Sequence, residues 1–388
     1  MLEVFLAFLK LGLTSFGGPI AHIGYFHREF VERRRWLDEA HYAQLLAISQ
    51  FLPGPASSQV GFSVGLIRAG WLGGLAAFVA FTLPSALLLF AFAAYLPHLQ
   101  HASGQAVLHG LKLVAVAVVA QGFLTMARRL TPDIQRILIA ASSTVAVLLL
   151  DSTWMQLGVV AAGAALGSVL CREMNDPASE ATFALRYSAR TGGWLLALFA
   201  VLLALSFLPV HGDLIVESAK AFYRAGALVF GGAHVVLPLL EEAMVVPGWI
   251  SSNDFFAGYG AAQAVPGPMF SVAAYLGARI NEQASVVGSL TSVLAIFLPG
   301  LLLVAGVLPM WQAVTRRAGM ASALAGINAA VVGLLAAALY DPIWMSAVRS
   351  AWDFWIALGA FALLYMRRAS VLLAIVFCLT ASLIRGSW

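Results

Sequence analysis

The chain has little charge and almost no cysteine. Only 10% of its 388 residues are charged, whereas 61% are hydrophobic, and soluble globular domains carry roughly 25% charged residues. The two cysteines, Cys171 and Cys378, stand alone and show no paired spacing, so the sequence supports neither a disulfide framework nor a metal-binding knuckle. We therefore expect a membrane-embedded chain that holds no metal and no cofactor.

Motifs of several other protein classes are missing as well. The sequence has no G-x-x-x-x-G-K-[ST] phosphate loop, which argues against an ATPase. It has no H-E-x-x-H zinc motif and no cluster of histidines with carboxylates. The formal net charge of +4 comes mainly from arginines in short loops, and no basic nucleic-acid-binding module is visible. We expect a protein that is not an enzyme and does not bind nucleic acid.

Long apolar segments recur from one end of the chain to the other. Because about 20 apolar residues cross the hydrocarbon core as a helix, this pattern predicts an all-α polytopic membrane protein. The opening stretch, MLEVFLAFLK, has no basic leader, so we expect a first membrane segment and not a cleaved signal. The expected uninterrupted spans are 70–96, 105–127, 136–151, 154–171, 192–209, 284–310, 320–340, 343–366 and 370–385.

Two interrupted segments occur twice in the sequence. QFLPGPASS, residues 50–58, has a counterpart in QAVPGPMFS, residues 263–271. Upstream, AFLKLGLTSFGG, residues 7–18, aligns with AFYRAGALVFGG, residues 221–232. The chain is therefore expected to be a tandem duplication.

The duplication predicts three parts of the chain. Residues 1–171 form the first repeat and residues 214–388 form the second. Between them, residues 172–213 supply a polar linker and one connecting transmembrane helix. Each half holds four spans after its interrupted segments, and the connecting helix makes the number odd, so the halves are expected to form an inverted-topology repeat.

The distribution of arginine agrees with inversion. Residues 28–35 hold four arginines, whereas the corresponding residues 241–254 hold no lysine or arginine. By the positive-inside rule the first stretch is cytoplasmic and the second lies outside, provided that the interrupted segments are re-entrant. We favour re-entrant segments because 39–52 and 56–67 are each too short to span. If both interrupted segments cross the membrane, the inversion persists but residues 28–35 lie outside, and this alternative stays open.

The interruptions are the expected substrate site. A helix that begins after Pro-Gly-Pro exposes unpaired amides, which favour anions, and in inverted repeats such breaks meet near the membrane midplane. The alternatives are that Pro-Gly-Pro is only a kink and that Phe-Gly-Gly serves only close helix packing. The candidate residues at the breaks are Gly17, Gly18, Gln50, Pro53, Gly54, Pro55, Ser57, Ser58, Gly231, Gly232, Gln263, Pro266, Gly267, Pro268 and Ser271.

Charged and titratable residues near the breaks add two further sets of candidates. Lys10 and Arg224 occupy equivalent repeat positions within apolar sequence, where a cation marks either a substrate site or a side chain that reaches the membrane interface. His22, His234 and Glu241 are candidates for proton coupling, since histidine titrates near neutral pH. Their alternative roles are a packed, hydrogen-bonded histidine and an exposed loop carboxylate.

The paired motifs resemble the chromate ion transporter family in its long, two-domain form. The resemblance rests on Phe16, Gly17, Gly18, Pro53, Gly54 and Pro55, and on Phe230, Gly231, Gly232, Pro266, Gly267 and Pro268. It implies a multi-pass protein of the bacterial inner membrane that exports chromate, confers chromate resistance and encounters sulfate as a close analogue. Because Met269 and Phe270 replace Ala56 and Ser57 in the second copy, we expect the first half to supply the polar side of the site.

A tetrahedral dianion suits such a site. Export of a dianion gains about 4.6 kcal/mol per 100 mV of inside-negative potential, so export needs no ATP, and proton exchange would only add to this drive. Two alternatives remain at this point: a sulfate or other oxyanion importer, and a membrane scaffold that transports nothing. Membrane lipid surrounds the chain in each case, and a homodimer is left open.

Overall fold

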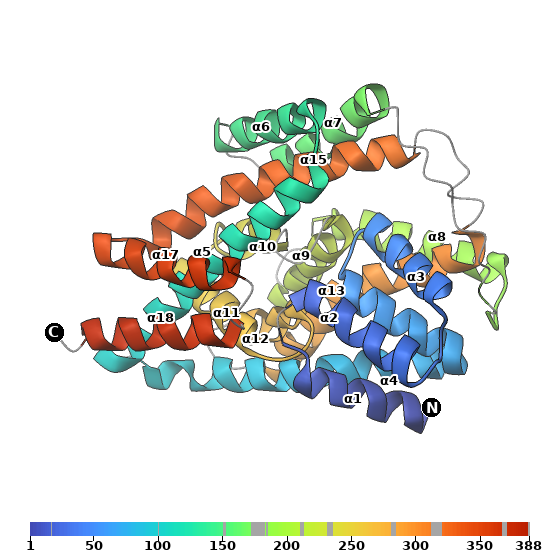
Figure 1. Ribbon diagram of the computed structural model, residues 1–388, viewed down its shortest axis with the longest axis horizontal. Helices are drawn as coiled ribbons and strands as arrows, with labels where there is room; N and C mark the ends of the chain where they lie inside the picture. Colours follow the sequence, from blue (N-terminus) through green and yellow to red (C-terminus); the bar gives the residue numbers. More distant parts are fainter. Residues whose placement is uncertain are drawn as a thin grey trace. The chain divides into compact units, whose positions relative to one another are not determined.

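The computed structural model describes residues 1–16, 18–99, 101–149, 153–171, 183, 185–209, 213–230, 236–280, 285–311, 320–366 and 371–386. Within these ranges all regular structure is helical (Figure 1). Five helical stretches there are long and apolar enough to cross a membrane: Ala56–Leu99, Ser103–Leu130, Ala189–Ser206, Val286–Met310 and Ser322–Ala347. The chain thus has the architecture of a helical, multi-pass membrane protein, as its composition predicts.

Helices cover the predicted spans. Beside the spanning helices α8 (Ala189–Ser206) and α13 (Val286–Val307), α5 covers Ala102–Leu130 and α15 covers Met320–Ala338. The shorter apolar helices are α6 (Ile134–Leu149), α7 (Thr153–Leu170), α17 (Ala351–Tyr365) and α18 (Val371–Gly386). Helices lie at the predicted positions, and five of them are long enough to span. The predicted span 343–366 is wrong in its bounds, because one helix ends at Ala347 and α17 begins at Ala351.

The helix that follows the first Pro-Gly-Pro is bent sharply. Helix α4 (Ala56–Tyr95) contains two residues with non-helical backbone angles, Ala69 (φ −140°, ψ 20°) and Gly70 (φ 67°, ψ −160°). The positive φ of Gly70 suits glycine, which pays no Cβ penalty there. Residues 56–68 therefore form a short helix of their own, and the long apolar segment starts after the bend, as predicted from the sequence.

The chain divides into two compact units, each of which draws on both of the segments that we predict to be repeats. Unit 1 comprises Met1–Ala91, Asp176–Val236 and Val265–Arg317. Unit 2 comprises Phe92–Asn175, Leu237–Ala264 and Ala318–Trp388. The division into residues 1–171, 172–213 and 214–388 concerns the sequence repeat and stays a prediction.

Unit 1 contains both Phe-Gly-Gly and both Pro-Gly-Pro positions. Its helices include α1 (Leu2–Thr14), α2 (Gly18–His27), α3 (Glu39–Phe51), α9 (Leu214–Leu228) and α12 (Val272–Arg279). Helix α13 packs against α8, α9 and α12. Helix α8 exposes Trp194, Leu198, Val201 and Leu205, which is the apolar surface expected of a helix that faces lipid.

Unit 2 is built around α5 and α15. Helix α15 runs alongside α6 and α7, and α5 contacts α11 (Ser252–Ala264), α17 and α18 (Figure 1). Helix α10 (Val236–Met244) precedes α11. Tight helix contacts in this unit rely on small residues, as at Gly163 and Gly326, where an added Cβ would strike the facing helix backbone.

Candidate functional site: paired helix breaks in unit 1

The first Pro-Gly-Pro separates α3 from α4. Helix α3 ends at Phe51 and α4 begins at Ala56, because Pro53 and Pro55 have no N–H to continue a helix. Gly54 turns the chain with a φ of 122°, a conformation that side chains with a Cβ rarely adopt. The N–H of Gly54 donates to the carbonyl of Val229 at 2.8 Å, so the turn is held by the residue that follows α9.

The second Pro-Gly-Pro makes the reciprocal contact. Gly267 has a φ of 104°, and its N–H donates to the carbonyl of Ser15 at 3.0 Å. Ser15 follows the last residue of α1, as Val229 follows the last residue of α9. Each Pro-Gly-Pro turn is therefore bonded to the chain just before the Phe-Gly-Gly position of the other repeat.

The two turn glycines also pack against equivalent places on the long helices. A Cβ on Gly54 would lie 2.9 Å from the Cα of Gly300 in α13. A Cβ on Gly267 would lie 2.9 Å from the Oγ of Ser85 in α4. Gly300 and Ser85 each follow the proline inside their helix, Pro299 and Pro84. Backbone packed this closely excludes any side chain larger than that of glycine at either turn.

Gln59 pairs the carbonyls around the first break. Its Nε2 donates to the carbonyl of Pro53 at 2.9 Å and to the carbonyl of Gly300 at 3.1 Å. The bond to Gly300 is buried and the bond to Pro53 is partly buried, and Gln59 itself has no exposed surface. An unpaired carbonyl in an apolar interior costs several kcal/mol, so this one amide stabilises both the broken helix and its contact with α13.

Hydroxyl and imidazole groups line the same region. His22, fully buried, contacts the carbonyl of Ser15 through Nε2 at 3.2 Å and the hydroxyl of Ser57 through Nδ1 at 3.4 Å. The Oγ of Ser85 donates to the carbonyl of Thr82 at 2.9 Å, and the Oγ atoms of Ser85 and Ser271 are 2.7 Å apart. We call these residues, together with Ser58, which follows Ser57 in α4, the break core. Its members are Ser15, His22, Gly54, Ser57, Ser58, Gln59, Thr82, Ser85, Val229, Gly267, Ser271 and Gly300.

The break core holds polar groups that no described residue satisfies. Four buried side-chain atoms have no hydrogen-bond partner among the residues that the structure describes: Ser15 Oγ, Ser58 Oγ, Gln59 Oε1 and Thr82 Oγ1. In α4, the first bond along the helix runs from the N–H of Gln59 to the carbonyl of Pro55 at 2.9 Å. The amides of Ala56, Ser57 and Ser58 therefore precede the bonded ladder and lack an intrahelical acceptor.

The two breaks differ in the polar groups that they leave without hydrogen bonds. After the second break the chain first makes a 3-10 turn, Met269–Ser271, in which the N–H of Ser271 donates to the carbonyl of Pro268 at 3.0 Å. The hydroxyl of Ser271 is engaged with Ser85. The first break presents unbonded helix amides and the free hydroxyl of Ser58 instead, so its polar groups are the more available ones.

Several predicted residues lie in other surroundings. Gln50 is exposed, and the carbonyl of Pro53 at the break is paired by Gln59 instead. Gln263 is buried in the last turn of α11 and bonds to the side chain of Tyr259. Gly18 has a φ of 73° at the start of α2. Pro266 and Pro268 are buried beside Gly267, and Gly17, Gly231, Gly232 and His234 lie outside the described residues.

The two predicted cations have partners away from the break core. Lys10 is 57% exposed at its side chain, and its Nζ lies 3.9 Å from Glu29. Arg224 donates to the carbonyl of Ser206, at the end of α8, and lies over the ring of Phe207. In these contacts neither cation is bonded to the break core, and their role as substrate ligands stays a prediction. Glu241, in α10, is half-buried.

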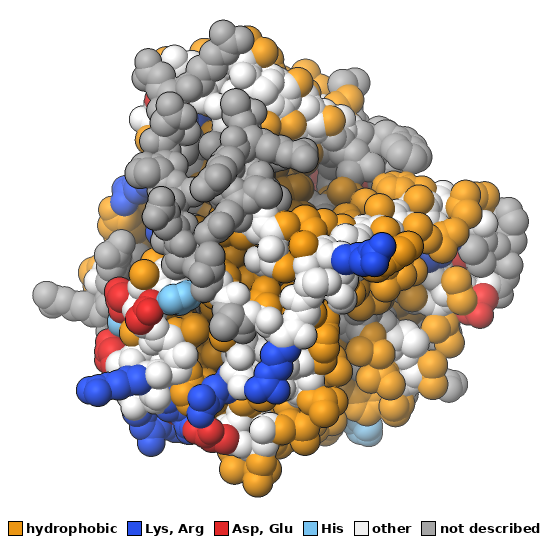
Figure 2. Space-filling view, turned by 90° about the vertical axis from the view of Figure 1, so that its right-hand side faces the viewer, with side chains coloured by type: hydrophobic (Ala, Val, Ile, Leu, Met, Phe, Trp, Pro, Cys, Tyr) orange, Lys and Arg blue, Asp and Glu red, His pale blue; other side chains and the backbone are white. Residues whose placement is uncertain are grey.

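Lys10 belongs to a charged cluster at the ends of α1 and α2. Glu29 accepts hydrogen bonds from Arg34 at 2.6 Å and from Arg33 at 3.0 Å. Burial alone would raise the pKa of Glu29, but these arginines and Lys10 hold the pKa below its ordinary value. The cations of Arg34 and Arg68 lie over the ring of Trp36, and Figure 2 shows basic and acidic side chains gathered together next to a wide hydrophobic area.

Six residues of the break core were not predicted from the sequence: Ser15, Gln59, Thr82, Ser85, Val229 and Gly300. Gln59 offered a signal, since it is a polar residue within the apolar run 56–67. A G-x-S-x-G pattern, Gly61 to Gly65, also falls here, but it lies inside α4 and Ser63 donates to the carbonyl of Gln59 at 2.7 Å. A nucleophile elbow requires a strand-to-helix turn, so this serine is a structural one.

Known proteins resemble this chain along most of its length. A model of the chromate transporter family matches residues 2–168 and 216–383. A probable chromate transport protein of Synechococcus elongatus is 29% identical over 338 residues, 86% of this chain and 82% of that protein. The chromate transport protein of Pseudomonas aeruginosa is 28% identical over 364 residues, 89% of this chain and 82% of that protein.

A shorter match covers about a third of the chain. An uncharacterised transporter of Bacillus subtilis is 32% identical over 130 residues, which cover 34% of this chain and 71% of that protein. No solved structure matches. Because the family model matches most of the sequence, in two separate segments, this chain belongs to the chromate transporter family.

Proposed function

We propose that this protein is a secondary transporter that exports chromate from the cytoplasm and binds it in the break core. The observation that carries the proposal is the reciprocal pair of bonds, Gly54 to Val229 and Gly267 to Ser15. These bonds bring the interruptions of both repeats into one buried core, where unpartnered hydroxyl and amide groups remain. Discontinuous helices of this kind form substrate sites in secondary transporters.

The free groups suit an oxyanion. Chromate and sulfate accept hydrogen bonds and donate none, and the amides of Ala56, Ser57 and Ser58 are donors at the positive end of a helix. The hydroxyl of Ser58 can donate without losing a bond, because it has no partner among the described residues. No side-chain cation of the described chain contacts the core residues, so the dianion would be bound without full neutralisation and released readily.

The membrane topology is part of the proposal. We place residues 28–35 in the cytoplasm of a bacterial cell and the two repeats in opposite orientations, with the helices around each Pro-Gly-Pro re-entrant. The bonds from Gly54 to Val229 and from Gly267 to Ser15 each join one predicted repeat to the other. They support this arrangement, since equivalent residues of an inverted repeat meet across a pseudo-two-fold axis. Helix α3 has 13 residues, about 20 Å of helix, which is shorter than the roughly 30 Å hydrocarbon core.

The membrane potential supplies the driving force. An inside-negative potential favours outward movement of a dianion by about 4.6 kcal/mol per 100 mV, and the described chain contains no phosphate loop that would couple to ATP. Proton movement could be linked through His22. When the imidazole is neutral, Nε2–H donates to the Ser15 carbonyl and Nδ1 accepts from the Ser57 hydroxyl.

Protonation of His22 reverses the direction of its hydrogen bond with Ser57. The imidazolium Nδ1–H then donates to Ser57, and the hydroxyl proton of Ser57 becomes available to the anion. A dianion in the break core would in turn favour the charged imidazole. Proton binding and anion binding are therefore cooperative in this proposal.

Everted membrane vesicles test the proposal directly. Vesicles that contain the protein should accumulate chromate when an inside-positive potential is imposed, and vesicles with the double variant Ser57→Ala, Ser58→Ala should accumulate much less. Ser168→Ala is the matched control, because its hydroxyl bonds only to the carbonyl of Ala165 on an exposed surface. Accumulation of sulfate without chromate would redirect the proposal to sulfate transport, and no accumulation of either anion would refute it.

A further inference from the structure

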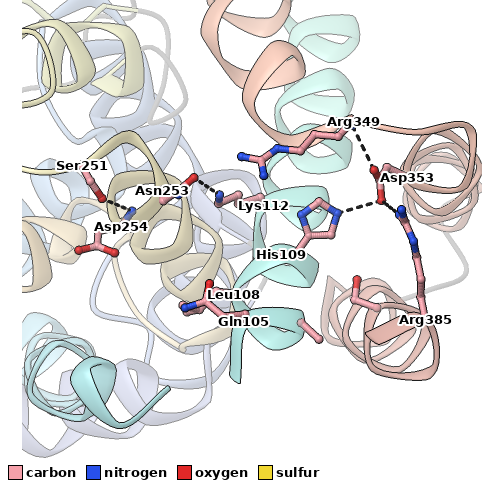
Figure 3. Close-up of a pocket in the computed structure, with 12 residues that line it drawn as sticks. Gln105, Leu108, His109, Lys112, Ser251, Asn253, Asp254, Arg349, Asp353 and Arg385 are labelled. Atoms are coloured by element: carbon pink, nitrogen blue, oxygen red, sulfur yellow. Dashed lines mark hydrogen bonds and ion pairs between the residues drawn. The ribbon is translucent and has the colours of Figure 1, made fainter. Parts of the chain in front are cut away.

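Unit 2 contains a polar cavity that the proposed transport site does not use. It has a volume of about 480 Å³ and lies where α5, α11, α17 and α18 come together (Figure 3). Its charged and titratable lining residues are His109, Lys112, Asp254, Arg349, Asp353 and Arg385. Three permanent cations face two carboxylates, so the lining has an excess of positive charge even when His109 is neutral.

Lys112 is the most unusual residue of the cavity. It lies within the apolar helix α5 and is only 5% exposed. Its ammonium donates to the amide oxygen of Asn253, which is a neutral partner. A buried ammonium without a bonded carboxylate is expensive in an apolar interior, so this position calls for a negative charge.

Of the two carboxylates in the lining, Asp254 attracts Lys112 electrostatically, and Asp353 is already bonded to other groups. Asp353 is 1% exposed and accepts from the Nε2 of His109 at 2.8 Å, from the Oγ of Ser350 at 2.9 Å and from the backbone N–H of Arg349 at 3.1 Å. It also accepts from Arg385. These four donors occupy Asp353, which neutralises Arg385. Asp353 is therefore not bonded to Lys112.

Arg349 brings a second positive charge to the cavity. Its guanidinium extends away from Asp353 and toward Lys112 (Figure 3), and the two positive charges repel each other. Among the described residues the guanidinium has no hydrogen bond or ion pair, because only the backbone of Arg349 is bonded to Asp353. Asp254 attracts Lys112, but one carboxylate cannot neutralise both cations, and paired cations that face a cavity are a common recognition element for an oxyanion.

A hydroxyl adds an independent sign of a missing ligand. Ser382, in α18, lines the cavity and is 3% exposed, yet its Oγ has no partner among the described residues. A buried hydroxyl is normally hydrogen-bonded. We propose that this cavity is a second binding site for a small inorganic oxyanion, held by Lys112 and Arg349 and completed by the hydroxyl of Ser382.

The position of the cavity along α5 indicates the side of the membrane on which the proposed second site lies. Lys112 and Arg128 are both in α5, separated by about 24 Å of helix at 1.5 Å per residue. By the positive-inside rule we place Arg128, at the end of α5, in the cytoplasm, and the cavity then lies toward the outer face. That the bound ion is the exported one rests on the proposed function, whereas the existence of an anion site in unit 2 does not.

Equilibrium binding of radiolabelled sulfate to the purified full chain in lipid nanodiscs tests the site. Arg349→Gln and Lys112→Gln should each weaken sulfate binding at the site in unit 2 by about tenfold or more, since hydrogen bonds to charged groups are the strong ones. Arg28→Gln, which also removes an exposed guanidinium, should bind as the unchanged protein does. Arg349 is exposed, so its variant should fold normally even if Lys112→Gln does not.

The outcomes separate this site from the transport proposal. If Arg349→Gln elutes as a folded protein and binds sulfate as tightly and in the same amount as the unchanged chain, the second site is refuted. If binding depends on Arg349 and persists in the Ser57→Ala, Ser58→Ala variant, the site in unit 2 is supported independently of the break core. If vesicles fail to transport chromate while this Arg349-dependent binding remains, only the proposed function fails.

Discussion

The amide of Gly54 donates to the carbonyl of Val229 at 2.8 Å, and this bond joins the first Pro-Gly-Pro turn to the end of α9. The equivalent bond from Gly267 to Ser15 measures 3.0 Å. Because each bond crosses from one repeat to the other, neither repeat can complete its own helix breaks. The structure of the site therefore depends on both turns at once.

Gly54→Ala should abolish folding or transport. The residue has a φ of 122°, which costs about 1–3 kcal/mol for a residue with a Cβ, and the new methyl would meet the Cα of Gly300 at 2.9 Å. Gly24→Ala is the control, since nothing lies within 4 Å of its added Cβ. Thermal unfolding followed by fluorescence-detected size exclusion should show a large loss for Gly54→Ala alone. Equal unfolding temperatures for the two variants would contradict the tight packing described here.

Gln59→Leu should destabilise the protein by about 1–3 kcal/mol for the carbonyls left unpaired. The substitution removes the donor to Pro53 and Gly300 while it keeps an apolar side chain of similar size. Gln50→Leu makes the same chemical change at an exposed position of the preceding helix. The midpoint of thermal unfolding should fall for Gln59→Leu and stay constant for Gln50→Leu. An equally small fall for both variants would indicate that water pairs the carbonyls of Pro53 and Gly300.

The sequence predicted local interruptions well and long-range partners poorly. Proline and glycine act on their own backbone, so the ends of α3 and α4 and the bend near Gly70 could be placed without a structure. Gln59 could not be assigned, because its partner Gly300 lies on α13, far along the chain. Lys112 carried a signal, a lysine inside the apolar span 105–127, but its significance depends on Arg349 and Asp353, which only the fold brings near.

The same contrast applies to Lys10 and Arg224. Their equivalent positions in the repeat made both attractive as substrate ligands, yet equivalence in sequence does not fix the direction of a long flexible side chain. In the fold, one pairs with Glu29 and the other caps α8 at Ser206. The duplicated backbone breaks carry more information than the duplicated charges, because a backbone conformation cannot be redirected by rotation of side-chain bonds.

Glu29→Gln should lower stability at neutral pH and have little effect in acid. Because the pKa of Glu29 is lower in the folded protein than its ordinary value, the stabilisation is complete above the ordinary carboxyl pKa and is lost as the pH falls through the folded value. We expect a cost of about 1.5–3 kcal/mol at pH 7. The difference in unfolding temperature from the unchanged protein should shrink below about pH 4.

Glu32→Gln supplies the control for this pH dependence. Glu32 is exposed and pairs with His27 at 3.1 Å, and exposed ion pairs contribute only about 0–1 kcal/mol. Its variant should unfold near the temperature of the unchanged protein at every pH. A Glu29→Gln difference that persists undiminished in acid would show that packing, and not the charge on Glu29, holds Arg33 and Arg34.

His22→Gln should flatten the pH dependence of chromate transport. In the unchanged protein, protonation of His22 frees the Ser57 hydroxyl for the anion, so transport at low chromate concentration should rise as the pH falls. Glutamine does not titrate, so the His22→Gln variant should transport chromate at the same rate at every pH tested.

His27→Gln is the matched control, because His27 lies at the surface, where its hydrogen bond to Glu39 raises its pKa. Its variant should retain the pH response, since His27 contacts Glu32, Glu39 and Tyr42 and not the break core. If His27→Gln flattens the profile and His22→Gln does not, the proton acts at the charged surface and the anion site itself is insensitive to pH.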